Sequence, residues 1–351
     1  MRLEPIATLE QARPTWEALE QQAGSIFSTW EWARAWWDAV GGDGELVLRQ
    51  AVDGDGAPFT LLPFYRQRRG PLTVLRMLGH GVADELAPVA AADDAARVGA
   101  ALALLAGSEL PPHGLALVDR LRGDTPLSLA LAGGAVRDEP SPVLPRDGRD
   151  GDAWLAGRSS NLRQQLRRRE RRLVRDHGLR YRLATDPERL DDDLSTLIRL
   201  HEARWADGGS IAFAGARERF HRTFARRALE RGWLRLWLAE TDGGAIAAWY
   251  GFRFGDSEWY YQAGRDPRCD RTGVGSVLLA HTIRSAFDDG VETYRFGVGD
   301  ESYKTRFADG DPRLRSVVMG RALPRQLALA ASRLGQRLPA DARHKLVRRA
   351  G

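Results

Sequence analysis

The sequence predicts an α/β protein with two domains, each built on a mixed sheet. The chain has 351 residues, which is more than one hydrophobic core of ordinary size requires. Short strand-like runs alternate with segments of helical periodicity along most of its length. Both halves also show the order helix, hairpin, strand, helix, strand. No repeat of individual residues is visible, so the pattern leaves an internal duplication open.

The first half is expected to be helical over residues 1–40, with aromatic residues concentrated in IFSTWEWARAWWDAVGG. Ser28 or Thr29 is expected to cap a helix that starts near Trp30, and Gly41-Gly42 to end it. The turn DGDG between ELVLRQAV and APFTLLPFYRQ predicts a β-hairpin. LTVLRMLG and GLALVDRL are predicted strands on either side of a helix in DDAARVGAALALLAGS. The Pro-, Gly- and Asp-rich segment VRDEPSPVLPRDGRDGD predicts a linker.

In the second half, an arginine-rich helix and the strand YRLAT precede two helices, DPERLDDDLSTLIRLHEARWADGG and ARERFHRTFARRALERG. The run WLRLWLAETDGGAIAAWYGFRFGDSEWYYQAG predicts three strands separated by two glycine turns. TGVGSVLLAHTIRSAFDDG is predicted to be a helix, because its apolar residues recur at helical spacing. VETYRFGVG is a predicted strand that ends at Gly297, and LRSVVMGRAL is predicted to be one more.

Composition narrows the class of protein. No run of eighteen apolar residues occurs, so no transmembrane helix is expected, and the first twenty residues lack the apolar region of a signal peptide. The single cysteine, Cys269, excludes an internal disulfide and suits a reducing compartment. We therefore predict a cytoplasmic location, with the inner membrane surface as an alternative. Lys304 and Lys345 are the only lysines among 52 basic residues, so Lys304 stands out against an arginine background.

The formal charge of +5 is concentrated in one segment. Residues 158–178 hold eight arginines against Glu170 and Asp176, and the remainder of the chain is close to neutral. This distribution is not that of a protein coated with positive charge for nucleic acid.

The turn RDPRCDRTGVGS lies between a predicted strand and a predicted helix. A glycine-rich turn that enters a helix exposes backbone N–H groups at the positive end of the helix dipole, which suits a pyrophosphate. Gly273 and Gly275 permit close approach of the backbone. The alternative is a plain turn. The dinucleotide motif GxGxxG fails at Leu278 and no lysine of a phosphate-binding loop follows, so Rossmann chemistry and nucleoside triphosphate hydrolysis are excluded.

The order of three strands, glycine turn, helix, strand and following tyrosine resembles the GNAT acyltransferase superfamily. RLHEARWADGG, EWYYQAGRDP and GVGSVLLAHTIRSAFDDGVETYRFGVGDESYKTRFA are similar to bacterial acetyltransferases described as BioF2-like or CelD-like. That group is related to the FemAB-type aminoacyltransferases, which carry tandem GNAT-like domains. The resemblance covers roughly residues 150–310 and is most specific in GDESYKTRF. It implies tandem GNAT-like (FemAB-like) domains: a GNAT-like domain over 1–145, the acyltransferase domain over 146–322 and a basic helical tail over 323–351.

The same resemblance implies an acyl-thioester donor, acetyl-CoA or another acyl-CoA, with its pyrophosphate on the glycine turn. No metal is expected, since the histidines show no metal-ligand spacing. The residues expected to hold the donor are Gln262, Gly264, Arg271, Gly273, Val274, Gly275 and Ser276. The family pattern has Arg or Gln three positions before the first glycine, whereas this chain has Asp270. An aspartate facing a pyrophosphate would repel it, which favours FemAB-type relatives that use aminoacyl-tRNA.

Acyl transfer requires a base for the acceptor, a donor for the developing oxyanion and an acid for the leaving thiolate. Tyr303 lies six residues past Gly297, near the position where GNAT enzymes place a tyrosine acid. Asp300 could be the base, and Lys304 could stabilise the oxyanion or bind an acidic substrate. The structural alternative is that Asp300 caps a short helix that contains Tyr303 and Lys304.

The acceptor is expected to contact Arg204, Trp205, Tyr260 and Asp266. The resemblance gives Arg204 and Trp205 this role, and the alternative is a stacked pair on the surface. Because side chains alternate along a strand, Tyr260 and Gln262 are expected to share one face, opposite Tyr261.

Two basic segments have separate interpretations. NLRQQLRRRERRL places Leu162, Leu166 and Leu173 on one stripe of a helix and arginines around the rest. The arginines form either a solvated face or a site for an anionic ligand such as a sugar phosphate, an undecaprenyl-linked glycan or RNA. The tail 323–351 is predicted to be a docked terminal helix, or else a helix on a membrane surface.

The predicted function is transfer of an acetyl or other acyl group from acyl-CoA to the amine or hydroxyl of a small molecule or glycan. The resemblance suggests exopolysaccharide or cell-envelope biosynthesis. One alternative is FemAB-type transfer from aminoacyl-tRNA. The other is a non-catalytic protein that binds RNA or membranes through residues 158–178 and the tail.

Overall fold

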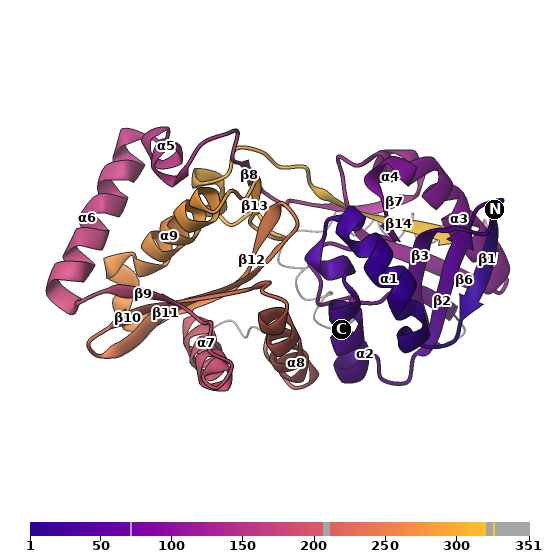
Figure 1. Cartoon of the computed structure of the whole chain (residues 1–351), viewed down its shortest axis with the longest axis horizontal. Helices are drawn as coiled ribbons and strands as arrows, with labels where there is room; N and C mark the ends of the chain where they lie inside the picture. Colours follow the sequence, from indigo (N-terminus) through magenta and orange to yellow (C-terminus); the bar gives the residue numbers. More distant parts are fainter. Residues whose placement is uncertain (71, 206–210, 321–325, 327–351) are drawn as a thin grey trace. The chain divides into compact units, whose positions relative to one another are not determined.

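The computed structural model describes residues 1–70, 72–205, 211–320 and 326. The chain forms two compact units (Figure 1). Unit 1 contains Met1–Ala23, Asp43–Glu139 and the described residues from Arg313 onward, and unit 2 contains Gly24–Gly42 and Pro140–Pro312. None of the helices in these ranges combines the length and the apolar composition that a bilayer crossing requires.

Unit 1 is built on a mixed sheet with the strand order β1-β2-β3-β4-β6-β14-β7, in which β4 and β6 are parallel and the other neighbours antiparallel. The strands are β1 (Arg2–Ile6), β2 (Glu45–Val52), β3 (Pro58–Arg69), β4 (Leu72–Met77), β6 (Gly114–Arg122), β7 (Ala135–Glu139) and β14 (Leu314–Gly320). The short strand β5 (Val89–Ala90) pairs with β3. The helices of this unit are α1 (Leu9–Ala23), α3 (Ala95–Glu109) and α4 (Pro126–Ala130).

The predicted hairpin of unit 1 is confirmed as β2 and β3, and its turn shows why the sequence specifies it. The Asp53 carboxylate accepts hydrogen bonds from the amides of Asp55 and Ala57, both at 3.0 Å. Gly56 has a φ of +85°, which an L-residue rarely adopts. The predicted strands β4 and β6 and the helix α3 between them are also confirmed.

Unit 2 has a mixed sheet with the order β8-β13-β12-β11-β10-β9, in which β12 and β13 are parallel. Its strands are β8 (Val143–Pro145), β9 (Arg180–Leu183), β10 (Leu234–Thr241), β11 (Gly244–Phe254), β12 (Ser257–Arg265) and β13 (Thr293–Arg295). Its helices are α2 (Trp30–Val40), α5 (Gly151–Ala156), α6 (Ser160–His177), α7 (Leu190–Arg204), α8 (Ala216–Glu230) and α9 (Val274–Asp288). Helices α6 and α9 lie on one face of the sheet, and α7 and α8 lie on the other (Figure 1).

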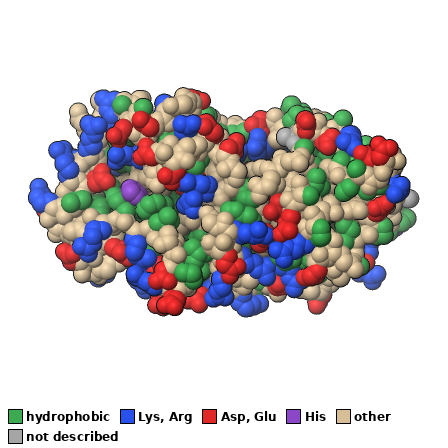
Figure 2. Space-filling model, viewed as in Figure 1, with side chains coloured by type: hydrophobic (Ala, Val, Ile, Leu, Met, Phe, Trp, Pro, Cys, Tyr) green, Lys and Arg blue, Asp and Glu red, His purple; other side chains and the backbone are tan. Residues whose placement is uncertain are grey.

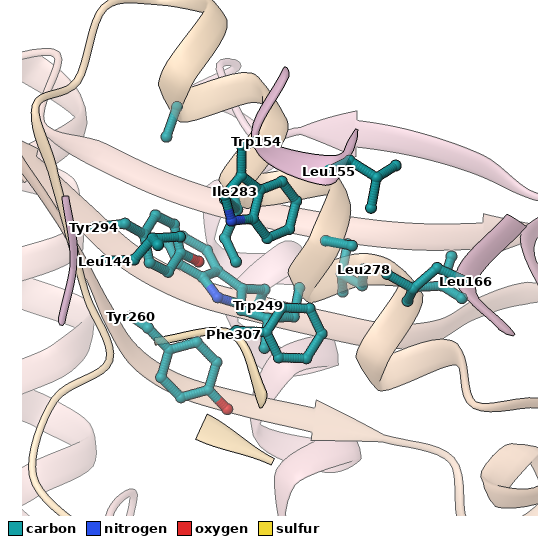
Figure 3. Close-up of a cluster of buried hydrophobic side chains, with 14 of the residues drawn as sticks. Leu144, Trp154, Leu155, Leu166, Trp249, Tyr260, Leu278, Ile283, Tyr294 and Phe307 are labelled. Carbon is teal, nitrogen blue, oxygen red and sulfur yellow. The ribbon is translucent and has the colours of Figure 1, made fainter. Parts of the chain in front are cut away.

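The two predicted helices on the α9 face of unit 2 are confirmed together with their apolar stripes. In α6, Ser159 caps the N-terminus by accepting from the amide of Leu162, and Gly178 ends the helix in the left-handed conformation. Leu162, Leu166 and Leu173 are buried, as their spacing predicts. Helix α9 buries the stripe that includes Val277, Leu278, Ile283 and Phe287. These side chains form a core cluster with residues of the sheet (Figure 3).

Residues 24–42 pack with unit 2, although they precede it by about a hundred residues. Thr29 caps α2 by accepting from the amide of Trp32, which confirms one of the two predicted caps. The Trp32 side chain is fully buried, with its ring centroid 4.7 Å from the centroids of Phe220 and Phe224. Glu31 is also buried and forms an ion pair with Arg231. Helix α2 therefore completes the core beside α8.

These two units differ in three places from the predicted limits 1–145, 146–322 and 323–351. Residues 24–42 pack with unit 2, the units change between Glu139 and Pro140, and β14 pairs with β6 and β7 of unit 1. Apolar periodicity identifies an element but not the sheet it joins. The predicted helical tail 323–351 lies outside the described residues, apart from Gln326.

Four short strands were not predicted. The expected helix over 1–40 begins with β1, the loop before α3 contains β5, and the expected linker after β6 contains β7 and β8. Elements of two to five residues provide too little periodicity to be recognised. The strand predicted to end at Gly297 is β13 alone and ends at Arg295. Gly297 and Gly299 bend the chain after it, with φ values of +68° and +120°.

Candidate active site

A cavity of about 350 Å³ opens in unit 2 where two parallel strands separate. Strand β13 pairs with β12 only from Ser257 to Trp259, whereas β12 continues to Arg265. The cavity begins beside Tyr260, directly after the last paired residue. Its lining comes from β11, β12, the turn before α9, α9 itself, α6, α7 and the loop after β13. The lining residues are Arg169, Arg204, Ala247, Ala248, Trp249, Tyr260, Ala263, Gly264, Arg265, Asp270, Gly273, Val274, Gly275, Ser276, Leu278, Leu279 and Tyr303.

The glycine turn forms one wall of this cavity. A short helical turn over Pro267–Thr272 leads into Gly273, which has a φ of +71° and immediately precedes α9. The Thr272 hydroxyl accepts from the amide of Val274, and the Gly273 carbonyl accepts from the amide of Ser276. The described residues give the amide of Gly275 no acceptor, and a β-carbon at Gly275 would meet only the Arg265 side chain, at 3.7 Å. The turn therefore presents a free N–H at the positive end of a fifteen-residue helix.

Positive charge predominates around the turn. Asp270, expected to repel a phosphate, forms an ion pair of 2.5 Å with Arg265, which offsets its charge. Arg169 and Arg204 also line the cavity, and neither forms an ion pair with a carboxylate in the described part of the chain. The Arg204 guanidinium lies 5.1 Å from the centroid of the Trp205 ring and 3.5 Å from the Ala263 carbonyl. The site can therefore hold an anion at the turn and a second one near Arg204.

Tyr303 and Tyr260 lie close together in the lining of the cavity. Tyr260 is 8% exposed and lies at the border of the buried cluster (Figure 3). The ring centroids of Tyr260 and Tyr303 are 6.3 Å apart. Burial, together with the neighbouring Tyr260 hydroxyl and a hydrogen bond with it, raises the pKa of Tyr303 far above its ordinary value. The Tyr303 hydroxyl therefore keeps its proton at neutral and mildly alkaline pH.

Asp300 and Lys304 are outside the cavity lining. Lys304 is only 2% exposed, and its Nζ donates to the Val298 carbonyl at 2.7 Å and pairs with Glu301 at 2.8 Å. These bonds hold the loop after β13 and so position the adjacent Tyr303. Asp300 is exposed, and the predicted cap by Asp300 is wrong, because the short helical turn starts at Lys304 and follows Tyr303.

The structure brings eight of the predicted site residues to the cavity: Arg204, Tyr260, Gly264, Gly273, Val274, Gly275, Ser276 and Tyr303. Four other predicted residues do not line it. Arg271 is exposed, and Trp205 is 40% exposed beneath the Arg204 guanidinium. Asp266 pairs with Arg268 and caps the helical turn before Gly273.

Gln262 is the fourth, and a β-bulge explains its position. The register between β11 and β12 shifts at Tyr250/Gly251, so that Tyr260 pairs with Gly251 and Gln262 with Tyr250. Tyr261 is the extra residue, and its ring packs with the aromatic cluster beside α8. Simple alternation does not continue across a bulge, so the prediction that Tyr260 and Gln262 share one face is wrong.

Several lining residues were not predicted from the sequence. Trp249, Ala247 and Ala248 come from β11, which was recognised only as a strand. Arg169 comes from α6, where it is one of seven arginines, and their number alone does not show which of them faces the cavity. A signal was present, because Arg169 lies on the same helical stripe as Leu162, Leu166 and Leu173. Within the described ranges, no group of three His, Cys, Asp or Glu side chains is arranged to hold a metal ion.

Comparisons with known proteins agree with this geometry. Residues 160–305 match the family model of the acetyltransferase (GNAT) domain. No curated protein sequence matches the chain significantly. The crystal structure of FemX is similar over 95% of this chain and 100% of its own, with a TM-score of 0.63 and 12% identity. The C-terminal domain of a protein described as a lysylphosphatidylglycerol synthetase from Agrobacterium fabrum is similar over 92% and 96%, with a TM-score of 0.58 and 12% identity.

A third similar structure is a tandem GNAT protein from the clavulanic acid biosynthesis pathway, over 92% of this chain and 99% of that one, with a TM-score of 0.50 and 12% identity. At such identities the similar structures show the fold alone, and the family match supplies the class of enzyme. Residues 160–305, which lie within unit 2, therefore form an acyltransferase domain of the GNAT type. The fold of the whole chain is similar to that of FemX and of the tandem GNAT protein.

Proposed function

We propose that this protein transfers an acyl group from an acyl-CoA thioester to an amine or hydroxyl acceptor. The observation that carries the proposal is the shared cavity. The glycine turn at Gly273–Ser276 and the protonated Tyr303 line the same space of about 350 Å³, with Arg169 and Arg204 beside them. A donor with phosphates at one end and a thioester at the other fits this distribution of charge.

The thioester would supply the activated acyl group, and the chain's own residues would bind and orient it. The free amide of Gly275 binds a pyrophosphate oxygen at the start of α9. Transfer forms a bond between the acceptor nitrogen or oxygen and the acyl carbon, and breaks the carbon–sulfur bond. Tyr303 keeps its proton and lines the cavity beside Tyr260, so it donates that proton to the leaving thiolate and regains one from water.

The acceptor must lose a proton, and the described lining offers no available base. Its one carboxylate, Asp270, is paired with Arg265. We therefore propose that the proton is released to water, so that an amine acceptor reacts in its neutral form. Asp300 stays a prediction as a base; it is exposed and is not among the residues that line the cavity.

The acceptor side of the cavity favours a molecule with an anionic group. Arg204 lines the cavity close enough to Tyr303 to lower the pKa of that hydroxyl slightly, against the larger effect of burial. An acidic sugar, a sugar phosphate or a similar cell-envelope precursor would pair with this guanidinium. This chemistry agrees with the exopolysaccharide or envelope role that the resemblance suggests.

The experiment that tests the proposal is release of free thiol from acetyl-CoA in the presence of acidic amino sugars, neutral amino sugars and simple amines. We expect thiol release that depends on the acceptor and is fastest with an acidic acceptor. Longer acyl-CoAs in the same assay define the acyl chain. Absence of acceptor-dependent thiol release from every acyl-CoA would refute the proposal.

A second candidate is transfer of an aminoacyl group from tRNA, which one specific observation favours. Arg167, Arg168 and Arg171 lie exposed on the outer face of α6, beside a shallow surface groove that also includes Asn161 and Gln164. Basic side chains gather at this edge of unit 2 (Figure 2). FemX and a lysylphosphatidylglycerol synthetase are among the similar structures. Transfer that RNase abolishes, with no thiol release from acetyl-CoA, would establish this candidate in place of the first.

A further inference from the structure

One arginine of α6 lies on the buried side of the helix. Arg169 follows Leu162 by seven residues and Leu166 by three, and precedes Leu173 by four, so all four share one helical stripe. The three leucines are buried in the core of unit 2. Arg169, the remaining member of this stripe, brings a charged group to the same side of the helix. Such a group is costly at this position unless its charge is solvated or paired.

The Arg169 side chain extends to the glycine turn. A β-carbon built on Gly273 would lie 2.7 Å from Cδ of Arg169 and 2.8 Å from its Nε and Nη1. The guanidinium is therefore in contact with the residue that begins α9, and it lines the cavity together with the backbone of Gly275 and Ser276. The left-handed φ of Gly273 and the absence of a side chain there both permit this approach.

Two carboxylates, that of the next residue in α6 and that of the cavity lining, are engaged by other groups. Glu170 accepts a hydrogen bond of 2.8 Å from the Tyr181 hydroxyl. Asp270, which lines the cavity, forms its ion pair with Arg265. No carboxylate in the described part of the chain forms an ion pair with Arg169. Its positive charge is therefore directed toward the cavity without a protein counter-charge, next to the free amide of Gly275.

We propose that Arg169 binds the phosphate groups of the donor at the glycine turn, so that α6 forms a wall of the donor site. This inference rests on the proposed function and adds a binding residue to it. A guanidinium offers two parallel N–H groups to a phosphate, and the amide of Gly275 offers a third donor from α9. Donor recognition then depends on the helix that precedes β9 as well as on the turn between β12 and α9.

The test compares Arg169→Ala with Arg172→Ala. Arg172 is an exposed arginine of the same helix that lines neither the cavity nor the surface groove of α6, so its variant makes the same change in charge away from both. Two donors are used: acetyl-CoA, and S-acetylpantetheine, which has the thioester but no phosphate. Arg169→Ala should raise KM for acetyl-CoA and the Kd for CoA by calorimetry about 10-fold or more, the range for a hydrogen bond to a charged group. Arg172→Ala should change neither.

With S-acetylpantetheine, kcat/KM should be the same for Arg169→Ala and the unmodified protein, because the phosphates are absent. Arg169→Lys should restore part of the CoA affinity. Equal losses with both donors would show a structural role and overturn the inference, as would unchanged CoA affinity. If the unmodified protein binds CoA but transfers no acyl group, only the proposed function fails, and the two Kd values still decide the role of Arg169. If it does not bind CoA, both proposals are wrong.

Discussion

Replacing Tyr303 with phenylalanine removes a single hydroxyl from the cavity and is the sharpest test of whether this residue protonates the leaving thiolate. The ring stays in its place beside Tyr260, since the change removes no carbon atom. The lost hydrogen bond with Tyr260 should lower the free energy of unfolding by about 1 kcal/mol, a small part of the ~5–15 kcal/mol typical of a domain. The loss of a proton donor for the thiolate should have a larger effect, on the activation free energy of transfer. General acid catalysis contributes about 100-fold or more to the rate, equivalent to about 2.7 kcal/mol of activation free energy.

We therefore expect kcat of Tyr303→Phe to fall about 100-fold, while the Kd for CoA changes less than about twofold, because the hydroxyl is at the thioester end of the site. Since burial raises the pKa of Tyr303, kcat of the unmodified protein should not decline between pH 7 and pH 9. Thiol release under saturating acetyl-CoA measures kcat, and calorimetry measures the Kd.

Tyr181→Phe is the matched control for this prediction. Tyr181 is also a largely buried tyrosine of unit 2, and its hydroxyl donates to Glu170 at 2.8 Å outside the cavity lining. The control loses the same atom and a comparable hydrogen bond, and its kcat should stay within about twofold of the unmodified value. A kcat for Tyr303→Phe above one third of the unmodified value, or an equal fall in the control, would refute the assigned role.

Three further predictions concern stability and the turn. Trp32→Ala should lower the free energy of unfolding by about 3–5 kcal/mol in urea titrations, since the indole is fully buried with its ring centroid 4.7 Å from the centroids of three phenylalanine rings. A loss below about 1 kcal/mol would contradict the assignment of residues 24–42 to unit 2. Burial lowers the pKa of His221 to about 3, so that the unfolded chain binds this proton below about pH 6.5 while the folded protein does not. Unfolding free energy should therefore fall from pH 6.5 to pH 4 by up to about 1.4 kcal/mol per pH unit more steeply than in His221→Phe, and equal slopes would contradict this. Gly273→Ala places a side chain at a φ of +71° and against Arg169, and should weaken CoA binding about 10-fold by calorimetry. Gly290→Ala is the control, because it introduces the same backbone strain of about 1–2 kcal/mol at a φ of +82°, with no atom within 4 Å, and should leave CoA affinity unchanged. Equal CoA affinities in the two variants would be inconsistent with a donor site at the turn.

Local signals were sufficient for much of the fold. The Asp53–Gly56 turn specified its hairpin, because the carboxylate satisfies two amides of the loop and glycine takes the left-handed position. Apolar residues at helical spacing identified α6 and α9. The order of elements that the two halves share corresponds to one parallel strand pair in each sheet, β4–β6 and β12–β13, which was not predicted.

Long-range pairing was beyond the sequence. The capping residue Thr29 predicted the start of α2, but no local sequence pattern shows that Trp32 packs beside α8 or that β14 pairs with β6. A pattern of apolar residues says that a surface must be buried and does not say against which partner. The β-bulge at Tyr261 was hidden for a similar reason, because it depends on register with the neighbouring strand.

In the site, the backbone features were predicted better than the charges. Gly273 and Gly275 are recognisable because the turn requires glycine, and Tyr303 because it follows a strand end. Lys304 stood out by composition, yet its ammonium is buried and paired with Glu301, and composition cannot distinguish a buried ion pair from a free one. Asp270 was expected to repel a phosphate, and its neutralising partner Arg265 was visible only in three dimensions.

Hydrogen–deuterium exchange of the chain with and without acetyl-CoA tests the donor site most directly. In the proposed donor site the N–H groups at the start of α9 bind the phosphates, and the described residues give the Gly275 amide no acceptor. Acetyl-CoA should slow exchange in peptides that cover residues 273–276, and S-acetylpantetheine should not. Protection that is confined to other segments, or equal protection by both thioesters, would mean that the donor's phosphates bind elsewhere.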